Sequence, residues 1–523
     1  MKRKLVSLLC VAAMAASLLA GCGKSNGEDK SKESTSQGEQ STSELEYVEL
    51  DWYVDLAAMP DCEEVNEALN EYFLEKINTK VNIHYWQASD YSEKVPTMLS
   101  SGQDMGIVTF AAFNLPFIQN VSQGAFLPLE DLLAEYGTGI KGLFNDDEWK
   151  TVTVDGHIYG IPMMMDNCYI ISMIYNEDLA NELGLDMENL KFKNWRQNEE
   201  FFMEALEKRN ELHPEWEGYP LLGDVCIEFP YFFAFERLID NNLAVCNIDG
   251  INDLAGYDCD TVVNFYETEE FREYCLMKQR MVANGIYAYD YEEWEDRLYD
   301  GFILADVGWG YTYIDEHMWN DEYTTKLKIS ENIWTDTSNY TGKGSAISAN
   351  CVNPERAMMV LELANTDPYV ATMLRFGIEG EHYIYNEEGD MTCVGSPKNG
   401  NPPDYGYRYW YGPSFGNLLI VDAPVELVGP NEELFEGILE CNNKAILPSH
   451  MGFVLDTTNI VNELAACSNV VEEYVDNFDY GWYESPEAVE KALDEFIAKL
   501  KANNVDKIVQ EVQSQIDAWN AAQ

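Results

Sequence analysis

The alternation of strand and helix patterns after residue 46 constrains the architecture more than any other feature of the chain. Apolar residues recur at helical spacing in two stretches, one beginning with a capping-box-like Asp61 and Glu64 and the other covering Ser92 to Leu99. Runs rich in β-forming residues flank these helices and predict strands over 47–54, 81–86 and 106–110.

This β-α-β-α-β order predicts an α/β fold built on an open, mainly parallel sheet flanked by helices. Ligands of such sheets bind beyond the carboxyl ends of the strands. We therefore expect the loops after Val54 and Phe110 to lie near a ligand.

The rest of the chain reads as mixed α/β, with its clearest helical pattern at the C-terminus. There, Ser485-Pro486 is a good N-cap and first-turn pair, followed by an apolar stripe to Leu500 and a second stripe from Val505 to Trp519. Further helices are expected over 201–210 and 268–282, and short buried strands over 302–308 and 418–421.

The N-terminus has the pattern of an export signal. The basic residues 2–4 precede an apolar run over 5–19, which is shorter than the roughly 20 residues of a spanning helix. The run ends in Leu19-Ala20-Gly21-Cys22, which resembles the bacterial lipobox. This resemblance implies that the Cys22 thiol receives a diacylglyceryl group, whose acyl chains are palmitate by expectation, and that the peptide before it is removed. The alternative is an ordinary secretory signal with a chance cysteine. Residues 23–46 are polar, and we expect a flexible tether.

The charge balance excludes some partners. The chain has 92 Asp and Glu against 33 Lys and Arg, a formal net charge of −59, so it lacks the basic surface that nucleic acid or anionic lipid requires. We expect no nucleic-acid partner and membrane contact through the lipid only. The acidity suits neutral or cationic ligands, or serves solubility alone.

No cofactor or metal site is predicted. The ten cysteines other than Cys10 and Cys22 form no C-x-x-C pair and no zinc-like spacing, so most are expected to be buried small hydrophobic residues. The run 247–253 has some calcium-loop character but lacks the 12-residue ligand spacing, which favours a turn.

A catalytic alternative remains open on the sequence. Residues 412–416 form a literal G-x-S-x-G pattern around Ser414, and Asp422 and His450 could complete a triad. The expected strand follows this serine instead of preceding it, contrary to a nucleophile elbow. The sequence does not exclude the paired carboxylates of a glycosidase, because 92 acidic residues make coincidental pairs unavoidable. On balance, we expect that this protein is not an enzyme.

Three strings resemble the extracellular solute-binding proteins of family 1. Residues 119–129 carry its G-x-hydrophobic-x-P-L turn, residues 155–162 its D-G-K-x-Y-G-x-P segment with His157 in the basic position, and residues 174–184 its Y-N-x-D-L element. Later strings resemble the LipO-type lipoproteins of this family, which carry a C-terminal domain of unknown function; they lie at 347–357, 376–383, 452–453 and 515–519.

The resemblance implies a two-lobed, type II periplasmic-binding-protein-like fold with a hinge between the lobes. The expected division is a signal peptide over 1–22, a tether over 23–46, the first lobe over 47–165, the second lobe over 166–304, a return to the first lobe and hinge over 305–385, and a C-terminal domain over 386–523.

A sugar ring has an apolar face and a polar rim, so its receptor needs flat aromatic surfaces beside carboxylates and amides. The chain has 12 Trp and 32 Tyr, many next to Asp or Asn. Residues 301–309 resemble a family segment that leads into a cleft-facing loop, which makes Trp309 the leading ligand-binding candidate. The other candidates are Trp52, Asp55, Asp166, Asn167, Tyr311, Trp334 and Trp410.

These observations favour a lipid-anchored substrate-binding protein on the extracellular face of a bacterial cell membrane, Gram-positive by expectation. It would bind a small molecule, an oligosaccharide by preference, and pass it to the permease subunits of an ABC importer. Two alternatives stay open: a surface glycan- or peptide-sensing lipoprotein without a transport role, and a surface hydrolase.

Overall fold

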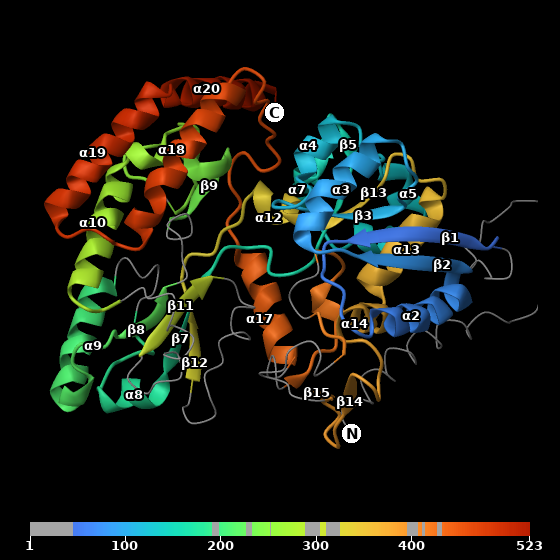
Figure 1. Cartoon of the computed structure of the whole chain (residues 1–523), viewed down its shortest axis with the longest axis horizontal. Helices are drawn as coiled ribbons and strands as arrows, with labels where there is room; N and C mark the ends of the chain where they lie inside the picture. Colours follow the sequence, from blue (N-terminus) through green and yellow to red (C-terminus); the bar gives the residue numbers. More distant parts are fainter. Residues whose placement is uncertain are drawn as a thin grey trace, which may run out of the picture. The chain divides into compact units, whose positions relative to one another are not determined.

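The computed structural model describes residues 45–190, 198–225, 233–251, 253–287, 304–309, 325–394, 406–409, 414–425 and 431–522 (Figure 1). Two sheets organise these residues, and each sheet has its own large hydrophobic core. We call each sheet with its core a lobe. The two-lobed α/β prediction is confirmed in this respect.

The first lobe is built on a five-stranded sheet with the order β2-β1-β3-β13-β6. The first strands are parallel and the last two pairings, β13 with β3 and with β6, are antiparallel. The strands are β1 (Val48–Val54), β2 (Thr79–Tyr85), β3 (Ile107–Ala111), β6 (Ile161–Pro162) and β13 (Lys343–Ile347), and the predicted helices between them are α2 (Cys62–Ile77) and α3 (Ala88–Ser100).

Short helices and two hairpins complete the elements of this part of the chain. The helices are α4 (Phe117–Ser122), α5 (Glu130–Glu135), α6 (Thr138–Lys141), α7 (Asp146–Thr151), α12 (Thr337–Thr341), α13 (Pro354–Thr366) and α14 (Pro368–Phe376). The hairpins pair β4 (Thr153–Val154) with β5 (His157–Ile158) and β14 (Tyr383–Tyr385) with β15 (Met391–Cys393).

The second lobe is built on a four-stranded sheet with the order β12-β7-β11-β8. Strand β7 (Ile171–Asn176) pairs antiparallel with β12 (Thr325–Ile329) and β11 (Ala305–Trp309), and β11 pairs parallel with β8 (Leu222–Val225). Both sheets are therefore mixed, whereas the sequence predicted mainly parallel ones. The right-handed β-α-β rule governs consecutive crossovers, and strands that return from elsewhere in the chain need not obey it.

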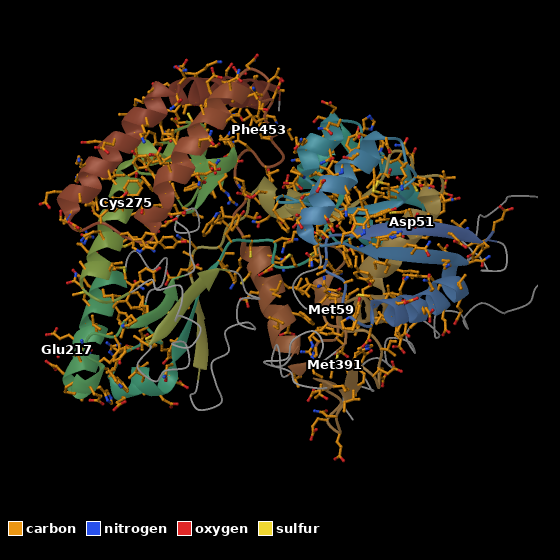
Figure 2. All side chains as sticks on the ribbon, in the orientation of Figure 1. Asp51, Met59, Glu217, Cys275, Met391 and Phe453 are labelled. Atoms are coloured by element: carbon orange, nitrogen blue, oxygen red, sulfur yellow. The ribbon has the colours of Figure 1, made fainter. Side chains whose placement is uncertain are left out.

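Helices from the middle and the end of the chain share the core of the second lobe. α10 (Glu269–Ala283) packs against α18 (Val461–Asp479) and α19 (Pro486–Ala502), and α20 (Val505–Ala522) packs on both of the latter (Figure 1). Figure 2 shows side chains filling this region around Cys275. The other elements of this part are α8 (Glu177–Glu182), α9 (Glu199–Leu212), β9 (Phe235–Arg237), β10 (Val245–Asn247) and the 3-10 turns η3 (Pro214–Trp216), η5 (Asp240–Asn242) and η6 (Phe265–Glu267). Helix α17 (Asn431–Lys444) lies outside both large cores and packs through Leu434 and Ile438 with α14 and the β14–β15 hairpin.

Helix-start predictions had mixed outcomes. Ser485 caps α19 as predicted, because its side chain accepts a hydrogen bond from the Ala488 amide. Asp61 stands before α2 but makes no capping hydrogen bond, and its Oδ2 lies 3.3 Å from Nε2 of His382 instead. The strand predicted over 418–421 is wrong, since Leu418–Ile420 forms a 3-10 turn capped by the Asn417 side chain.

The predicted lobe boundaries also differ from the hydrogen-bonding pattern. Residues 305–309 and 325–329 remain with the second sheet through β7, and the chain rejoins the first sheet only at β13. The predicted boundary at 385/386 cuts through the β14–β15 hairpin. The lobe boundaries depend on the pairing between distant strands, which cannot be predicted from local composition.

All nine described cysteines are free thiols, and six of them are buried, in agreement with the predicted hydrophobic role. Among the described helices, none combines the length and hydrophobicity needed to cross a bilayer. Within the same residues, no group of three or more His, Cys, Asp or Glu side chains could hold a metal ion.

Strand β13 lies so close to its neighbours that Gly344 cannot take a side chain. A Cβ atom at this position would overlap the Phe110 ring and the Ile161 carbonyl oxygen. We expect Gly344→Ala to lower the free energy of unfolding by about 2 kcal/mol or more, because backbone and a buried ring must move.

Urea unfolding monitored by circular dichroism measures this change. Gly142→Ala is the matched control, since its Cβ would meet the carbonyl oxygens of Gly139 and Thr138 at 3.5 and 3.8 Å, both ordinary contacts. Equal stability of the two variants would contradict the close approach.

Candidate functional site

A buried carboxylate follows directly after β1, where the sequence predicted a ligand-facing loop. Asp55 is 9% exposed, and its Oδ1 accepts a hydrogen bond from Thr109 Oγ1 at 3.0 Å. Its Oδ2 accepts from Asn114 Nδ2 at 2.9 Å and from Ser414 Oγ at 3.0 Å. Three separate segments thus fix this carboxylate at the carboxyl end of β1.

A lysine and a second carboxylate add charge to the same region. Lys343 opens β13 and pairs with Ala111 at the carboxyl end of β3. Burial lowers the pKa of the Lys343 ammonium, while the charges of Asp166 and Asp55 act in the opposite direction. The ammonium therefore lies within electrostatic range of both carboxylates. We call Asp55, Thr109, Asn114, Asp166, Lys343 and Ser414 the Asp55 cluster.

Asn167 and Asp166 are both buried, at 3% and 7% exposure. The Asn167 backbone amide donates to Asn442 Oδ1 at 2.9 Å, and its side chain donates to the Met163 carbonyl at 3.2 Å. The Asn167 carbonyl also accepts from Thr335 Oγ1 at 2.8 Å. Asn167 is thus engaged with the protein, and α17, through Asn442, holds this segment.

The predicted tryptophans fall into two groups. Trp52 is 0% exposed and meets Phe415 edge-on at 4.9 Å, and Trp334 is 3% exposed with its ring 5.5 Å from that of Tyr169. As placed, neither ring offers a face to a ligand, which favours packing roles over the predicted stacking roles. Trp309 lies in β11, where its backbone pairs with Ile171, but its side chain lies outside the described residues.

Three further candidates, Tyr311, Trp410 and the lipid-attachment residue Cys22, also lie outside the described residues. Their predicted roles stay predictions.

A second polar cluster surrounds Tyr169, and sequence patterns found only part of it. The Tyr169 hydroxyl lies 2.9 Å from Ser338 Oγ and 3.3 Å from Asp336 Oδ1. Arg237 places its guanidinium 4.7 Å from the centre of the Tyr169 ring, and its Nε lies 3.1 Å from Asp336 Oδ2. Asp336 and Tyr169 stand in the aromatic-acid strings of the sequence, whereas nothing local singles out Arg237.

The loop after β3 exposes an aromatic ring that the sequence patterns also did not single out. Phe113 is 66% exposed and follows the exposed Ala112, while Ala111 and Asn114 on either side of this pair are buried. The sequence could have indicated Phe113 through its position, because the loop after Phe110 was expected to face a ligand.

The hydrolase alternative finds no support in this geometry. Ser414 donates to a carboxylate, while the two ring nitrogens of His450 contact Glu236 and Asp260, and Asp422 accepts from Tyr385. The three residues of the hypothetical triad thus belong to three separate networks. A serine nucleophile needs a base within hydrogen-bond reach, and no imidazole contacts Ser414 among the described residues.

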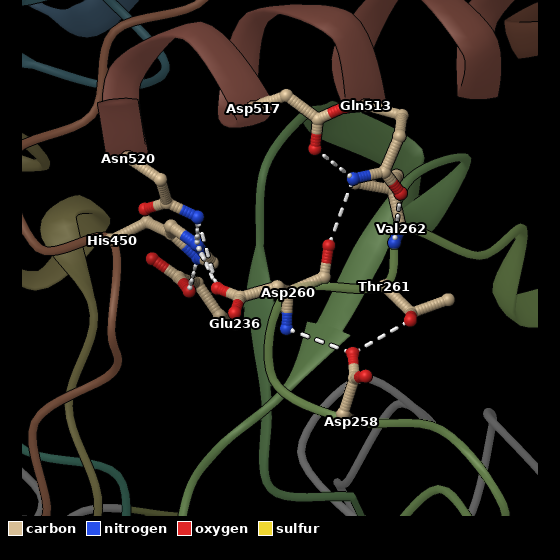
Figure 3. A network of polar contacts seen from close by, with 9 residues as sticks. All are labelled: Glu236, Asp258, Asp260, Thr261, Val262, His450, Gln513, Asp517 and Asn520. Atoms are coloured by element: carbon tan, nitrogen blue, oxygen red, sulfur yellow. Dashed lines mark hydrogen bonds and ion pairs between the residues drawn. The ribbon is translucent and has the colours of Figure 1, made fainter. Parts of the chain in front are cut away.

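His450 joins the C-terminal helices to the β9–β10 region (Figure 3). Its Nδ1 lies 2.8 Å from Glu236 Oε2 and its Nε2 lies 3.2 Å from Asp260 Oδ1, while Asn520 of α20 donates to the same Asp260 oxygen at 3.0 Å. The Trp519 ring lies edge-on to the imidazole at 5.7 Å. Gln513 of α20 extends the network by donating to the Asp260 carbonyl.

Protonation governs this contact. Burial of the imidazole lowers the pKa of His450, but the hydrogen bonds and charges of Glu236 and Asp260 outweigh it and leave the pKa above the ordinary 6.5. Burial also raises the pKa of the Glu236 carboxyl, and the bond to His450 partly offsets that rise. The folded protein therefore holds protons here that the unfolded chain releases.

Stability should consequently fall as pH rises. The contribution of His450 is fully present below pH 6.5 and is lost as pH increases through the raised pKa of the folded state. We expect His450→Gln to flatten the decline of the unfolding free energy above pH 6.5, measured by urea unfolding across a pH series. His157→Gln, at an exposed histidine, is the control, and identical slopes for wild type and His450→Gln would contradict this assignment.

Comparison with known proteins identifies two segments. Residues 63–202 match the family model described as bacterial extracellular solute-binding protein, and residues 449–521 match a domain of unknown function, DUF3502. The strings over 119–129, 155–162 and 174–184 lie inside the first match, and those over 452–453 and 515–519 inside the second. The predicted resemblance is confirmed over these segments.

The chain is 24% identical to a carbohydrate ABC transporter substrate-binding protein of Streptococcus pneumoniae serotype 4, over 97% of this chain and 96% of that protein. Among solved structures, it resembles the N-glycan transport solute binding protein NgtS of Streptococcus pneumoniae, with a TM-score of 0.71 and 21% identity over 90% of this chain and 99% of that one. It also resembles the alginate-binding protein AlgQ2, with a TM-score of 0.56 and 16% identity over 92% and 100% of the respective chains. These likenesses support the two-lobed solute-binding fold.

Proposed function

We propose that this chain is a bacterial extracellular solute-binding protein that captures an oligosaccharide and delivers it to the permease of an ABC importer. The names of its relatives support this proposal, since they include a carbohydrate ABC transporter substrate-binding protein and the solute-binding protein NgtS, which was crystallised with Man1GlcNAc and with Man5GlcNAc. The protein is proposed to bind its ligand without transforming it.

The observation that carries the proposal is the Asp55 carboxylate. An ionised carboxylate can accept about four hydrogen bonds, and Asp55 accepts three from the protein. Its orientation is therefore fixed before any ligand arrives, with capacity for about one further donor. A sugar hydroxyl is such a donor, and a preoriented acceptor binds it at reduced entropic cost.

The ligand is proposed to act by shifting a population of open and closed forms. Contacts made by both lobes favour the closed form, which then engages the permease. The surrounding groups suit a neutral polyhydroxyl compound, because Lys343 can donate where Asp55 and Asp166 accept.

Two other functions share the same geometry. A surface glycan sensor would bind the same sugars without a permease, so uptake of the ligand by cells lacking this protein distinguishes it from a transport component. A peptide receptor would instead be stabilised by short peptides.

Binding can be tested by thermal shift and calorimetry with Man1GlcNAc, Man5GlcNAc, kestose and a set of short peptides. We expect oligosaccharides to stabilise the protein, and Asp55→Asn to weaken binding by about tenfold or more, because a charged acceptor is lost. Asp131→Asn is the control, since Asp131 is an exposed carboxylate in α5.

Ser414→Ala removes one donor to Asp55 and should weaken binding less than Asp55→Asn. Each variant's unfolding temperature without ligand serves to separate lost binding from lost folding. Stabilisation by peptides alone would contradict the sugar proposal, and unchanged affinity in a folded Asp55→Asn protein would contradict this site.

The lipid anchor is the other part of the proposal. The lipobox string, the polar stretch after it and the extracellular family support acylation of Cys22 and display on the outer face of the cell membrane. Two acyl chains would hold the protein durably.

Cys22→Ala should therefore move the protein from the membrane fraction to the medium or the soluble fraction. Immunoblots of fractionated cells and the intact mass of the purified protein measure the change. Cys10→Ala is the matched control, because that cysteine lies inside the predicted signal peptide. Equal membrane retention of the two variants would exclude the anchor.

A further inference from the structure

The loop after β3 holds a phenylalanine ring outside the protein on a fixed backbone. The Ala112 amide donates to the Gly342 carbonyl at 3.0 Å, and the amides of Asn114 and Leu115 donate to the Ala111 carbonyl at 3.1 and 2.9 Å. Residues on both sides of Phe113 are thus tied down, while its own side chain is 66% exposed.

The exposed tip of this loop is only two residues long. Ala112 and Phe113 are exposed, whereas all five residues of β3 before them are buried and Asn114 and Leu115 after them are 5% and 0% exposed. Burying a phenylalanine side chain stabilises a protein, and this loop leaves that stabilisation unused. Single exposed apolar residues are common, so exposure alone does not indicate a role.

Two further observations distinguish Phe113. It is the one exposed phenylalanine among the residues that the structure describes, and no aromatic ring of those residues packs on it. The exposed rings of Tyr369 and Trp482, by contrast, lie 4.9 Å from Tyr72 and 4.7 Å from Tyr480. In addition, the next residue, Asn114, donates directly to Asp55, so the ring stands one residue from a group that orients the site carboxylate.

We propose that Phe113 is the stacking platform for one pyranose unit of the oligosaccharide, and that Asp55 accepts a hydroxyl from the same ligand. This inference rests on the proposed sugar-binding function and names the residue that would contact the apolar face of a ring. A flat aromatic surface fits a pyranose that presents a face of C–H groups, while a carboxylate takes its polar rim.

The experiment compares three substitutions of Phe113 by calorimetry with the oligosaccharide that most stabilises the wild type among Man1GlcNAc, Man5GlcNAc and kestose. Phe113→Ala should weaken binding about tenfold or more, since the stacking surface is lost. Phe113→Leu keeps an apolar side chain without a flat face and should weaken binding by a similar factor. Phe113→Trp should stay within about threefold of the wild type.

Trp482→Ala is the matched control, because Trp482 is 52% exposed and packs on another ring. All Phe113 variants should keep the unfolding temperature of the wild type, as their side chain is mostly in solvent. A spectroscopic readout is independent of affinity: the emission of Phe113→Trp should change on adding sugar, relative to the wild type.

Wild-type affinity in both Phe113→Ala and Phe113→Leu would overturn this inference and leave sugar binding intact. Wild-type affinity in Phe113→Leu alone would also overturn it, since a general apolar contact would then suffice. If the wild type binds none of the three oligosaccharides, the proposed function fails and this inference fails with it.

Discussion

The antiparallel strand β13 is the constraint on which the first lobe depends. It lies between β3 and β6, and four of its five residues are buried. The strand reaches this position only after the chain has completed β11 and β12 of the other sheet. Without β13, the edge of β3 would be unpaired and Lys343 would not stand near Asp55 and Asp166. Sheet closure and site assembly are therefore one event.

The Asp55 cluster follows from the cost of burying a charge. A carboxylate removed from water is tolerated when hydrogen bonds replace its hydration. Thr109, Asn114 and Ser414 provide that replacement, and in doing so they fix the direction of the carboxylate. The hydrogen bonds that offset the cost of burying Asp55 therefore also hold its carboxylate in one orientation. The same arrangement engages Ser414, which donates to Asp55 despite its G-x-S-x-G context, and no imidazole contacts it among the described residues.

Local patterns predicted much of the fold and part of the site. Strand β1, helix α19 and the loop position of Asp55 follow from alternation, capping and strand-end geometry, all of which act over a few residues. The burial of Trp52 and Trp334 could not be predicted in this way, because adjacency to an acid in sequence does not place both side chains on one face; neighbours on a strand point to opposite sides. The position of Arg237 and the mixed pairing of both sheets depend on contacts between distant segments, which local patterns do not contain. The exposure of Phe113 could not be predicted either, because a short loop has no periodicity.

The hydrogen bond between Ser414 and Asp55 joins residues 359 positions apart. Asp55, at the end of the first strand, can therefore accept this hydrogen bond only after most of the polypeptide has been synthesised. Long-range closure of this kind is slow relative to local structure formation. The ligand site proposed around Asp55 would thus be among the last features of the first lobe to form.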